Sequence, residues 1–408
     1  MGRGGSLTLR LPLTPCGLRL VGRAARRHAR GVEPFKDRIS PGLVRAFGHQ
    51  LRRHASAAAA AGFEAAVLPR LDALGLKARV GLVAEALHAA LPGPAAARHA
   101  TLGRMLHPGE GDAVAFEGAS DERGIRGWGV WPLTEAAGRF GLDDFDGGLA
   151  LLREATKRSS AEFAVRRFLL HDQGRALRTL ARWVGDPHPA VRRLVSEGAR
   201  PRLPWATQLP GLRADPGPAL PLLGRLRDDP HPTVRLSVAN FLNDVSKDHP
   251  DRAAALGAAW LRGAPPERAR LVRHALRTLV KAGHPGALAA LGFHPPEVEV
   301  GPLRLSAPAV RVGEALTFSA RIRSTGRGPQ RLVVDHVLHL LRADGSRSAK
   351  VWKGAVVELP AGGEVTHTRT HRFRETTVRT LRPGVQRVRL RVNGRDEPAV
   401  GFELRPAR

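Results

Sequence analysis

Cysteine, tyrosine and acidic side chains are scarce in this sequence. Its single cysteine, Cys16, cannot form an internal disulfide, so a reducing compartment is expected. No run of about 18 apolar residues predicts a transmembrane helix. The 17 histidines have neither an H-E-x-x-H pattern nor paired-ligand spacing, so we expect no metal or other cofactor. These absences argue against disulfide-rich secreted, membrane-spanning and metal-dependent classes of protein.

The shortage of acids leaves a large excess of positive charge. Against 37 Asp and Glu stand 65 Lys and Arg, which gives a formal net charge of +28. Nucleic acid is the commonest polyanion that such a chain binds, because phosphate neutralisation releases condensed counterions. The abundant alanine and glycine and the missing tyrosine also fit a codon bias, which accounts for part of the excess. Nucleic acid is therefore favoured as the partner over an anionic membrane surface.

Three regions differ in composition and periodicity. Residues 1–33 carry seven arginines and one acid, Glu33, and are expected to form a basic flexible tail, with a targeting segment as the alternative. Residues 34–294 repeat apolar side chains at helical spacing, broken by Gly and Pro. Residues 297–408 alternate apolar and polar side chains between glycine-rich turns. We predict a helical domain followed by an antiparallel Ig-like β-sandwich.

The helical region contains an internal repeat. The string DPHPAVR at residues 186–192 returns as DPHPTVR at residues 229–235, 43 residues later, and a looser copy, VRHA, follows at residues 272–275. A period near 40 with two helices per unit is typical of HEAT repeats. In each turn, Asp can cap the next helix and Pro fits its first turn. Such units must stack to bury their apolar stripes, so we predict an α-solenoid of HEAT-like repeats with a concave surface.

Several specific strings follow one another along the chain. In the helical region they are WGVWP (128–132), EFAVR (162–166), SEGARPRLPW (196–205), SVANFLNDVSKDHP (237–250) and VRHALRTLVK (272–281). Together they resemble the motifs of the AlkC-type DNA alkylation repair family. The β region, from LVVDH (332–336) to KVWK (350–353), is similar to the Ig-like domain that some members carry. The resemblance covers residues 35–408, with two departures: Arg167 replaces an expected proline and Ala199 an expected threonine.

This resemblance implies a DNA glycosylase. Family members hydrolyse the N-glycosidic bond of N-methylated, cationic bases such as 3-methylcytosine and 3-methyladenine, without turning the damaged base into a pocket. The departing base leaves an oxocarbenium-like sugar, which nearby carboxylates can stabilise while they position a water. The resemblance further implies a monomer that binds double-stranded DNA containing alkylated bases, located in the bacterial cytoplasm and associated with the nucleoid.

Three acids are the candidate catalytic residues: Glu162, Glu197 and Asp244. The 43-residue offset maps Glu197 onto Asn240, and Asp244 lies one helical turn further on the same face. The two acids are therefore predicted to line adjacent repeats. Each acid also has a structural interpretation. Glu162 can complete a capping box or pair with Arg166, Glu197 can be an exposed last-turn residue, and Asp244 can pair with Lys247.

Further residues are candidates for binding the lesion or the DNA backbone. Trp205 lies in a proline-flanked turn and is predicted to stack on the lesion or its deoxyribose, although core packing is the commoner role of such a side chain. The other candidates are polar side chains that could hold the DNA: Arg166, Arg193, Arg200, Arg202, Asn240, Lys247, Arg273 and Arg277.

Two other functions stay open from the sequence. A HEAT-like array can bind damaged or branched DNA without excising a base, and it can serve as a scaffold for acidic proteins. The complete set of three acids argues against the first alternative. The second leaves the string SEGARPR at residues 196–202 unexplained.

Overall fold

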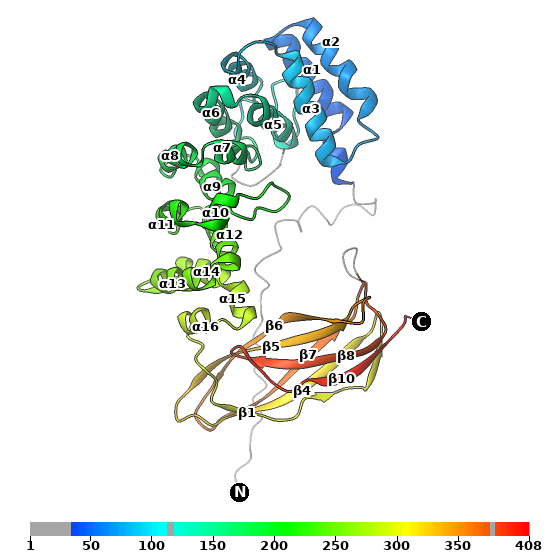
Figure 1. Ribbon diagram of the computed structural model, residues 1–408, viewed down its shortest axis with the longest axis vertical. Helices are drawn as coiled ribbons and strands as arrows, with labels where there is room; N and C mark the ends of the chain where they lie inside the picture. The colour runs from blue at the N-terminus through cyan, green and yellow to red at the C-terminus, as the bar shows by residue number, and fades with distance from the viewer. Residues whose placement is uncertain (1–33, 112–117, 376–379, 408) are drawn as a thin grey trace.

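Figure 1 shows a column of helices with a β-sandwich at its lower end. The structure, a computed structural model, describes residues 34–111, 118–375 and 380–407. The predicted basic tail, residues 1–33, and with it Cys16 lie outside the described residues. The predicted fold class, a helical array followed by an Ig-like β-sandwich, is confirmed.

Short helices build the column in two rows. Among the described residues, the α-helices are α1 (Pro41–His54), α2 (Ala57–Val67), α3 (Leu76–Ala90), α4 (Ala95–Arg104), α5 (Val130–Phe140), α6 (Phe145–Ala155), α7 (Val165–His171), α8 (Gln173–Trp183), α9 (Pro189–Gly198), α10 (Pro210–Ala214), α11 (Leu220–Leu226), α12 (Pro232–Asp248), α13 (Pro250–Leu261), α14 (Pro266–Ala275), α15 (Arg277–Ala282) and α16 (Pro285–Ala290). Helices α6, α8, α11 and α13 form the outer row, whereas α5, α7, α9 and α12 form the inner row (Figure 1). Apolar side chains such as Leu180 and Phe241 meet in a core that extends from α6 to α16, and α1 to α5 share a second core.

The repeated DPHP turns start the inner helices α9 and α12. Pro189 and Pro232 each occupy the first turn, as predicted. The predicted cap is wrong, because His188 and His231, not the aspartates, are the N-cap residues and accept from backbone amides with their side chains. Asp186, three residues before the helix begins, instead accepts from the amide of His188 at 2.8 Å.

The aspartates of these turns also join successive repeats. Arg153 of α6 donates to Asp186 at 2.7 Å, and Arg192 of α9 donates to Asp229 through two bonds of 2.6 and 3.0 Å. Both aspartates are buried. Because a bidentate arginine–carboxylate pair fixes both distance and direction, these bonds set the spacing of neighbouring repeats.

The third copy of the repeat differs from the first two. Where the second copy has the single helix α12, the third has α14 and α15, separated at Leu276. Val272 and Arg273 therefore lie near the end of a helix, whereas the matching Val–Arg pairs of the first two copies lie near a helix start. The helix α15 ends at Gly283, whose φ of +79° is the left-handed conformation that glycine favours at such an end.

Two sheets pack face to face in the sandwich. The strands are β1 (Val298–Val300), β2 (Arg304–Leu305), β3 (Ala309–Arg311), β4 (Ala315–Ser324), β5 (Gln330–Leu341), β6 (Arg347–Leu359), β7 (Glu364–Arg372), β8 (Gly384–Val392), β9 (Arg395–Asp396) and β10 (Val400–Arg405). One sheet has the order β1-β4-β2 with β7 also beside β4, and the other has the order β3-β10-β8-β5-β6 with β9 beside β8. The pair β3–β10 is parallel, so the predicted antiparallel sandwich has one parallel pair at this edge.

Hydrogen bonds from side chains to backbone carbonyl groups, and one close approach of two glycines, join the sandwich to the end of the column. Arg391 of β8 donates to the carbonyl oxygen of Lys281 at 2.8 Å, and the Asn393 side chain donates to that of His294 at 2.8 Å. Gly283 and Gly394 lie so close that a Cβ on Gly394 would stand 2.8 Å from the Gly283 Cα. A small apolar cluster of Leu288, Phe293 and Val333 lies nearby. The two modules therefore have a fixed contact.

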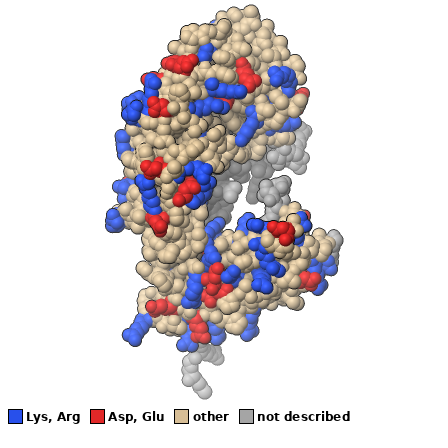
Figure 2. Space-filling view, in the orientation of Figure 1, with Lys and Arg blue, Asp and Glu red and all other residues tan. Residues whose placement is uncertain are grey.

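The column and the sandwich enclose a hollow in the molecule. In Figure 2 the surface is hollowed between the upper helices and the sandwich, and Lys and Arg side chains are spread over both parts. No single described helix is long and apolar enough to cross a membrane; α3 and α4 together pass that test by length and composition, but they are bent by 113°.

Candidate active site

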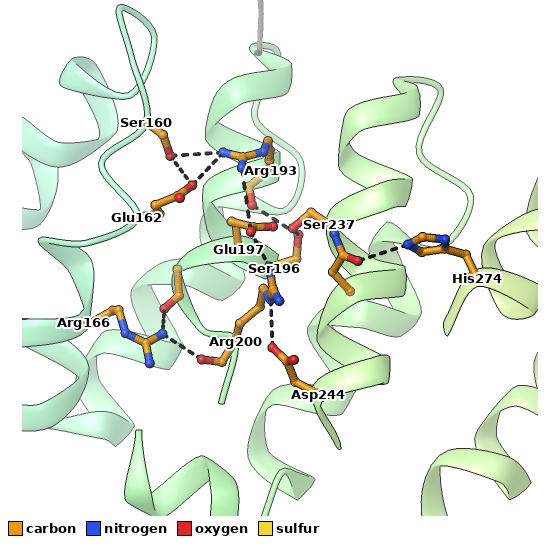
Figure 3. A network of polar contacts seen from close by, with 12 residues as sticks. Ser160, Glu162, Arg166, Arg193, Ser196, Glu197, Arg200, Ser237, Asp244 and His274 are labelled. Atoms are coloured by element: carbon orange, nitrogen blue, oxygen red, sulfur yellow. Dashed lines mark hydrogen bonds and ion pairs between the residues drawn. The ribbon is translucent and has the colours of Figure 1, made fainter. Parts of the chain in front are cut away.

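A chain of alternating acids and arginines links the inner helices (Figure 3). Arg193 lies between Glu162 and Glu197, with guanidinium nitrogens 3.0 and 3.8 Å from their carboxylate oxygens. Arg200 lies between Glu197 and Asp244 and donates to them at 2.6 and 2.9 Å. The structure thus brings together all three predicted catalytic acids, and we call these five residues the carboxylate network.

Inner helices position each acid of the network. Glu162 lies shortly before α7, Glu197 lies in the last turn of α9, and Asp244 lies near the end of α12. A carboxylate near a helix C-terminus faces the negative end of the helix dipole. The helix dipole therefore disfavours Glu197 and Asp244 at these positions. Their ion pairs with Arg193 and Arg200 offset this loss of stability.

The three carboxylates are almost completely removed from solvent. The exposed fraction is 8% for Glu162, 6% for Glu197 and 1% for Asp244. Burial by itself raises the pKa of Glu197, but the charges of Arg193 and Arg200, with hydrogen bonds from Ser237 and Arg200, bring that pKa below its ordinary value. Glu197 is therefore held as an anion at neutral pH.

The purely structural role that the sequence offered for each acid is found for Asp244 but not for Glu162 or Glu197. Glu162 accepts from the Ser160 hydroxyl at 2.7 Å and pairs with Arg193; α7 has no side-chain cap, so a capping role is excluded. Glu197 is buried, so it is not an exposed last-turn residue. Asp244 does pair with Lys247 at 3.0 Å, in addition to its bond with Arg200.

Arg166 lies beside the network but faces the protein interior. Its exposed fraction is 1%, and it donates to the carbonyl oxygens of Thr207, Gly198 and Arg200 at 2.6, 3.0 and 2.7 Å. Burial, reinforced by the charge of Arg200, lowers the pKa of its guanidinium to about 10. This placement argues against the expected phosphate contact, because one carbonyl at the end of α9 and two in the following loop already hold the side chain.

Asn240 and Arg277 form a second cluster, next to Asp244 on the side of α14. The Asn240 Oδ1 accepts from His274 Nε2 and from Arg277 Nη2, both at 3.1 Å. Burial and the charge of Arg277 lower the pKa of His274 to about 4, so its ring is neutral at pH 7. Asn240 is the position onto which the repeat maps Glu197. It holds a polar side chain one helical turn before Asp244.

The remaining side chains that were predicted to contact the DNA backbone differ in their exposure to solvent. Lys247 and Arg273 are exposed. Arg202 is half-buried and bound to Asp248 through two bonds, at 2.7 and 2.5 Å. Arg273 is thus a cation of the predicted set that phosphate could reach directly, whereas Lys247 is exposed but bound to the buried Asp244 at 3.0 Å.

Trp205 is exposed, contrary to the usual behaviour of tryptophan. Its exposed fraction is 56%, and its φ of +67° is in the left-handed region that side chains other than Asn, Asp and Gly seldom adopt. Its ring meets that of Phe35 edge-on at a centroid distance of 6.1 Å. A strained and exposed aromatic side chain next to the network supports a functional role over core packing.

Sequence reasoning missed three polar members of the site. Ser160 donates to Glu162, Ser237 donates to Glu197, and His274 contacts Asn240. His274 and Ser237 lie within strings singled out in the sequence, although neither was named as a site residue. Ser160 lies only two residues before its partner Glu162, so that close spacing was the available signal. In the described ranges, no group of three or more His, Cys, Asp or Glu side chains could hold a metal ion.

The fold and the network define a class of protein in which a helical array presents buried carboxylates and an Ig-like domain follows. The family model described as the C-terminal Ig-like domain of the uncharacterised protein YhaZ matches residues 299–406. The uncharacterised protein YhaZ of Bacillus subtilis is 34% identical over 267 residues, which are 65% of this chain and 74% of YhaZ.

A solved structure extends this relationship over nearly the whole chain. Alkylpurine DNA glycosylase AlkC of Pseudomonas fluorescens, bound to DNA containing an abasic site analog, is 33% identical, with a TM-score of 0.79. The match covers 91% of this chain and 100% of the AlkC chain. The protein described here belongs to the family of AlkC and YhaZ.

Proposed function

We propose that the protein is a DNA glycosylase that releases alkylated bases from double-stranded DNA. The observation that carries the proposal is the carboxylate network, because three buried acids within a protein of net charge +28 need a reason other than phosphate binding. The likeness to AlkC, whose structure contains DNA with an abasic site analog, supports the same activity. The substrates proposed are N-methylated, cationic bases such as 3-methyladenine and 3-methylcytosine.

The network suits hydrolysis of a glycosidic bond with a cationic leaving group. As the base departs, positive charge develops on the sugar, and Glu197 and Asp244 offer fixed negative charge in a site with little water. One carboxylate can also orient the attacking water, as in other glycoside hydrolyses. Binding and fixed electrostatics supply the catalysis without turning the damaged base into a pocket.

Lys247 is the residue that controls access to Asp244. It is exposed and holds one carboxylate oxygen of Asp244 at 3.0 Å, while Arg200 holds the other at 2.9 Å. A phosphate that draws the flexible Lys247 side chain away frees that oxygen for the sugar or its water. The protein acts in this proposal as a monomer, in the cytoplasm of a bacterium and associated with its nucleoid.

The direct test uses oligonucleotide duplexes that each hold one defined methylated base. We expect free 3-methyladenine or 3-methylcytosine and an abasic site as products, with the same rate when a metal chelator is present. Chromatography with mass detection measures the released base. Release of no base from any alkylated duplex would contradict the proposal.

A second candidate is a protein that binds damaged or branched DNA without excision. The burial of Asp244, at 1% exposed, and its two cationic partners favour this alternative, because a fully neutralised acid can be purely structural. The same assay separates the two functions. Tight binding to the duplexes with all bases retained would support the non-catalytic one.

A further inference from the structure

A cavity of about 290 Å³ lies beside the carboxylate network and has no role in the mechanism above. Helices α3, α5 and α7 and the loop of residues 205–207 line it. Pockets that bind small ligands have volumes from about 300 Å³ upward, so this cavity is close to the lower end of that range. Arg166 connects the cavity to the network, because it lines the cavity and also donates to the carbonyl oxygen of Arg200.

One wall of the cavity is aromatic. Trp131 and Phe163 stack there with ring centroids 4.5 Å apart and planes 26° from parallel. The exposed Trp205 stands at its edge, in its left-handed backbone conformation. Phe163 directly follows Glu162, so neighbouring residues of one segment serve the cavity and the network. Flat aromatic rings at a basic surface are what unpaired bases stack on.

Four of the other lining residues are cationic. Lys77, Arg139, Arg166 and Arg167 line the cavity, and Glu135 is the single acid among its lining residues. Glu135 already pairs with Arg167. Lys77 and Arg139 are exposed at the surface, although Arg139 also contacts Glu85 at 2.8 Å. This charge attracts a phosphate and repels a cationic alkylated base.

We propose that the cavity binds one unpaired nucleotide of the DNA, namely the nucleotide opposite the damaged base. Its base lies against Phe163 and Trp205, with the buried Trp131 stacked on Phe163, and its phosphate meets Lys77 and Arg139. The inference rests on the proposed function for the identity of the DNA partner. The damaged base itself is not the occupant, because its positive charge opposes that of the lining residues.

Gly81 offers a way to fill the cavity without disturbing the fold. It lies within α3 and lines the cavity, and a Cβ on it would meet only Arg139 Nη1, at 4.0 Å. A leucine in place of glycine within a helix also favours helix formation. The matched control is Gly224 on the outer helix α11, where a Cβ would meet nothing within 4 Å.

The probe is a duplex that carries an abasic site analogue with 2-aminopurine opposite it, and anisotropy confirms that the protein is bound. We expect wild type and Gly224→Leu to change the 2-aminopurine emission equally, and Gly81→Leu to reduce that change by about tenfold at saturation. Equal changes in wild type and Gly81→Leu would overturn the proposal. Because the analogue holds no base to excise, the result does not depend on glycosylase activity.

A second arm separates a DNA nucleotide from a free one. Deoxyadenosine monophosphate is titrated while tryptophan emission is recorded. Binding that Gly81→Leu abolishes, together with an emission change of the duplex that also depends on Gly81, supports the proposed chemistry. Binding of the free nucleotide with no Gly81-dependent change in the duplex overturns the assignment to the DNA strand.

Discussion

At the scale of single residues, the arginines of the site divide into two kinds that sequence cannot separate. Arg166, Arg193 and Arg200 hold carbonyls and carboxylates in the interior, whereas Arg273 is exposed. All four belonged to one predicted set of DNA contacts. The residue type was informative, but the direction of each side chain depends on loops and helices that meet it only in the folded chain.

Arg166 is expected to be a residue on which stability depends. Its replacement in Arg166→Met leaves the carbonyls of Thr207, Gly198 and Arg200 without that donor, which should lower the free energy of unfolding by about 3 kcal/mol. The urea midpoint measures this effect. Arg178→Met, at an exposed position of α8, is the control and should leave the midpoint unchanged. A urea midpoint equal to that of the wild type for Arg166→Met would contradict this stabilising role of Arg166.

At the scale of elements, the repeats and the strands could be predicted from the sequence to different degrees. The DPHP strings gave the starts of α9 and α12, because proline in a first helical turn is a local signal. The split of the third copy into α14 and α15 was not predicted, nor was the parallel pairing of β3 with β10. Both depend on packing against distant segments.

The interior of the sandwich contains an unusual group of histidines. His336 of β5 and His367 and His371 of β7 are buried, and His336 stands 5.0 Å from the Phe318 ring and 5.7 Å from that of His371. Burial, with the neighbouring charges of His371, Arg369 and His367, lowers the pKa of His336 to about 4. Burial and Arg369 likewise lower the pKa of His367 to about 4. The folded sandwich therefore holds both rings neutral.

This histidine group should make the sandwich sensitive to acid. Above pH 6.5, the ordinary pKa, the rings are neutral in both the folded and unfolded chain, so the stability is fully present. As the pH falls from 6.5 toward about 4, only the unfolded chain gains protons, and each ring costs about 3 kcal/mol of stability over that window. Pulse-labelling hydrogen exchange in urea, read on peptides from β5 and β7, measures the loss.

A substitution identifies the source of the acid sensitivity. His367→Leu should make the stability of β5 and β7 less dependent on pH, because one proton-binding ring is removed. His49→Leu, at an exposed position of α1, should leave the dependence as it is. A pH dependence that is the same in wild type and His367→Leu would show that this ring does not cause it.

At the scale of the whole molecule, the contact between column and sandwich fixes the hollow seen in Figure 2. The change from helical to alternating periodicity predicted both modules in their correct order. Their relative placement could not be predicted, because it depends on Gly283, Gly394, Arg391 and Asn393, which look like ordinary turn and surface residues in the sequence.

The Gly283–Gly394 contact predicts how the two modules can be separated. A Cβ in Gly394→Ala would stand 2.8 Å from the Gly283 Cα, so the sandwich must shift away from α15. Gly345→Ala is a matched control, since its φ of +79° is equally left-handed but its Cβ would meet nothing within 4 Å. Small-angle scattering should report a larger radius of gyration for Gly394→Ala alone. Identical scattering for both variants and wild type would contradict a tight contact.

The central claim is that the buried carboxylates perform the excision, and single-turnover kinetics on a duplex with one 3-methyladenine or 3-methylcytosine test it most directly. Glu197→Gln and Asp244→Asn should each slow base release by about 100-fold or more without weakening DNA binding. Asp248→Asn, one helical turn after Asp244 in α12 but paired with Arg202 outside the network, should stay close to the wild-type rate. Unchanged rates in both network variants would contradict the account.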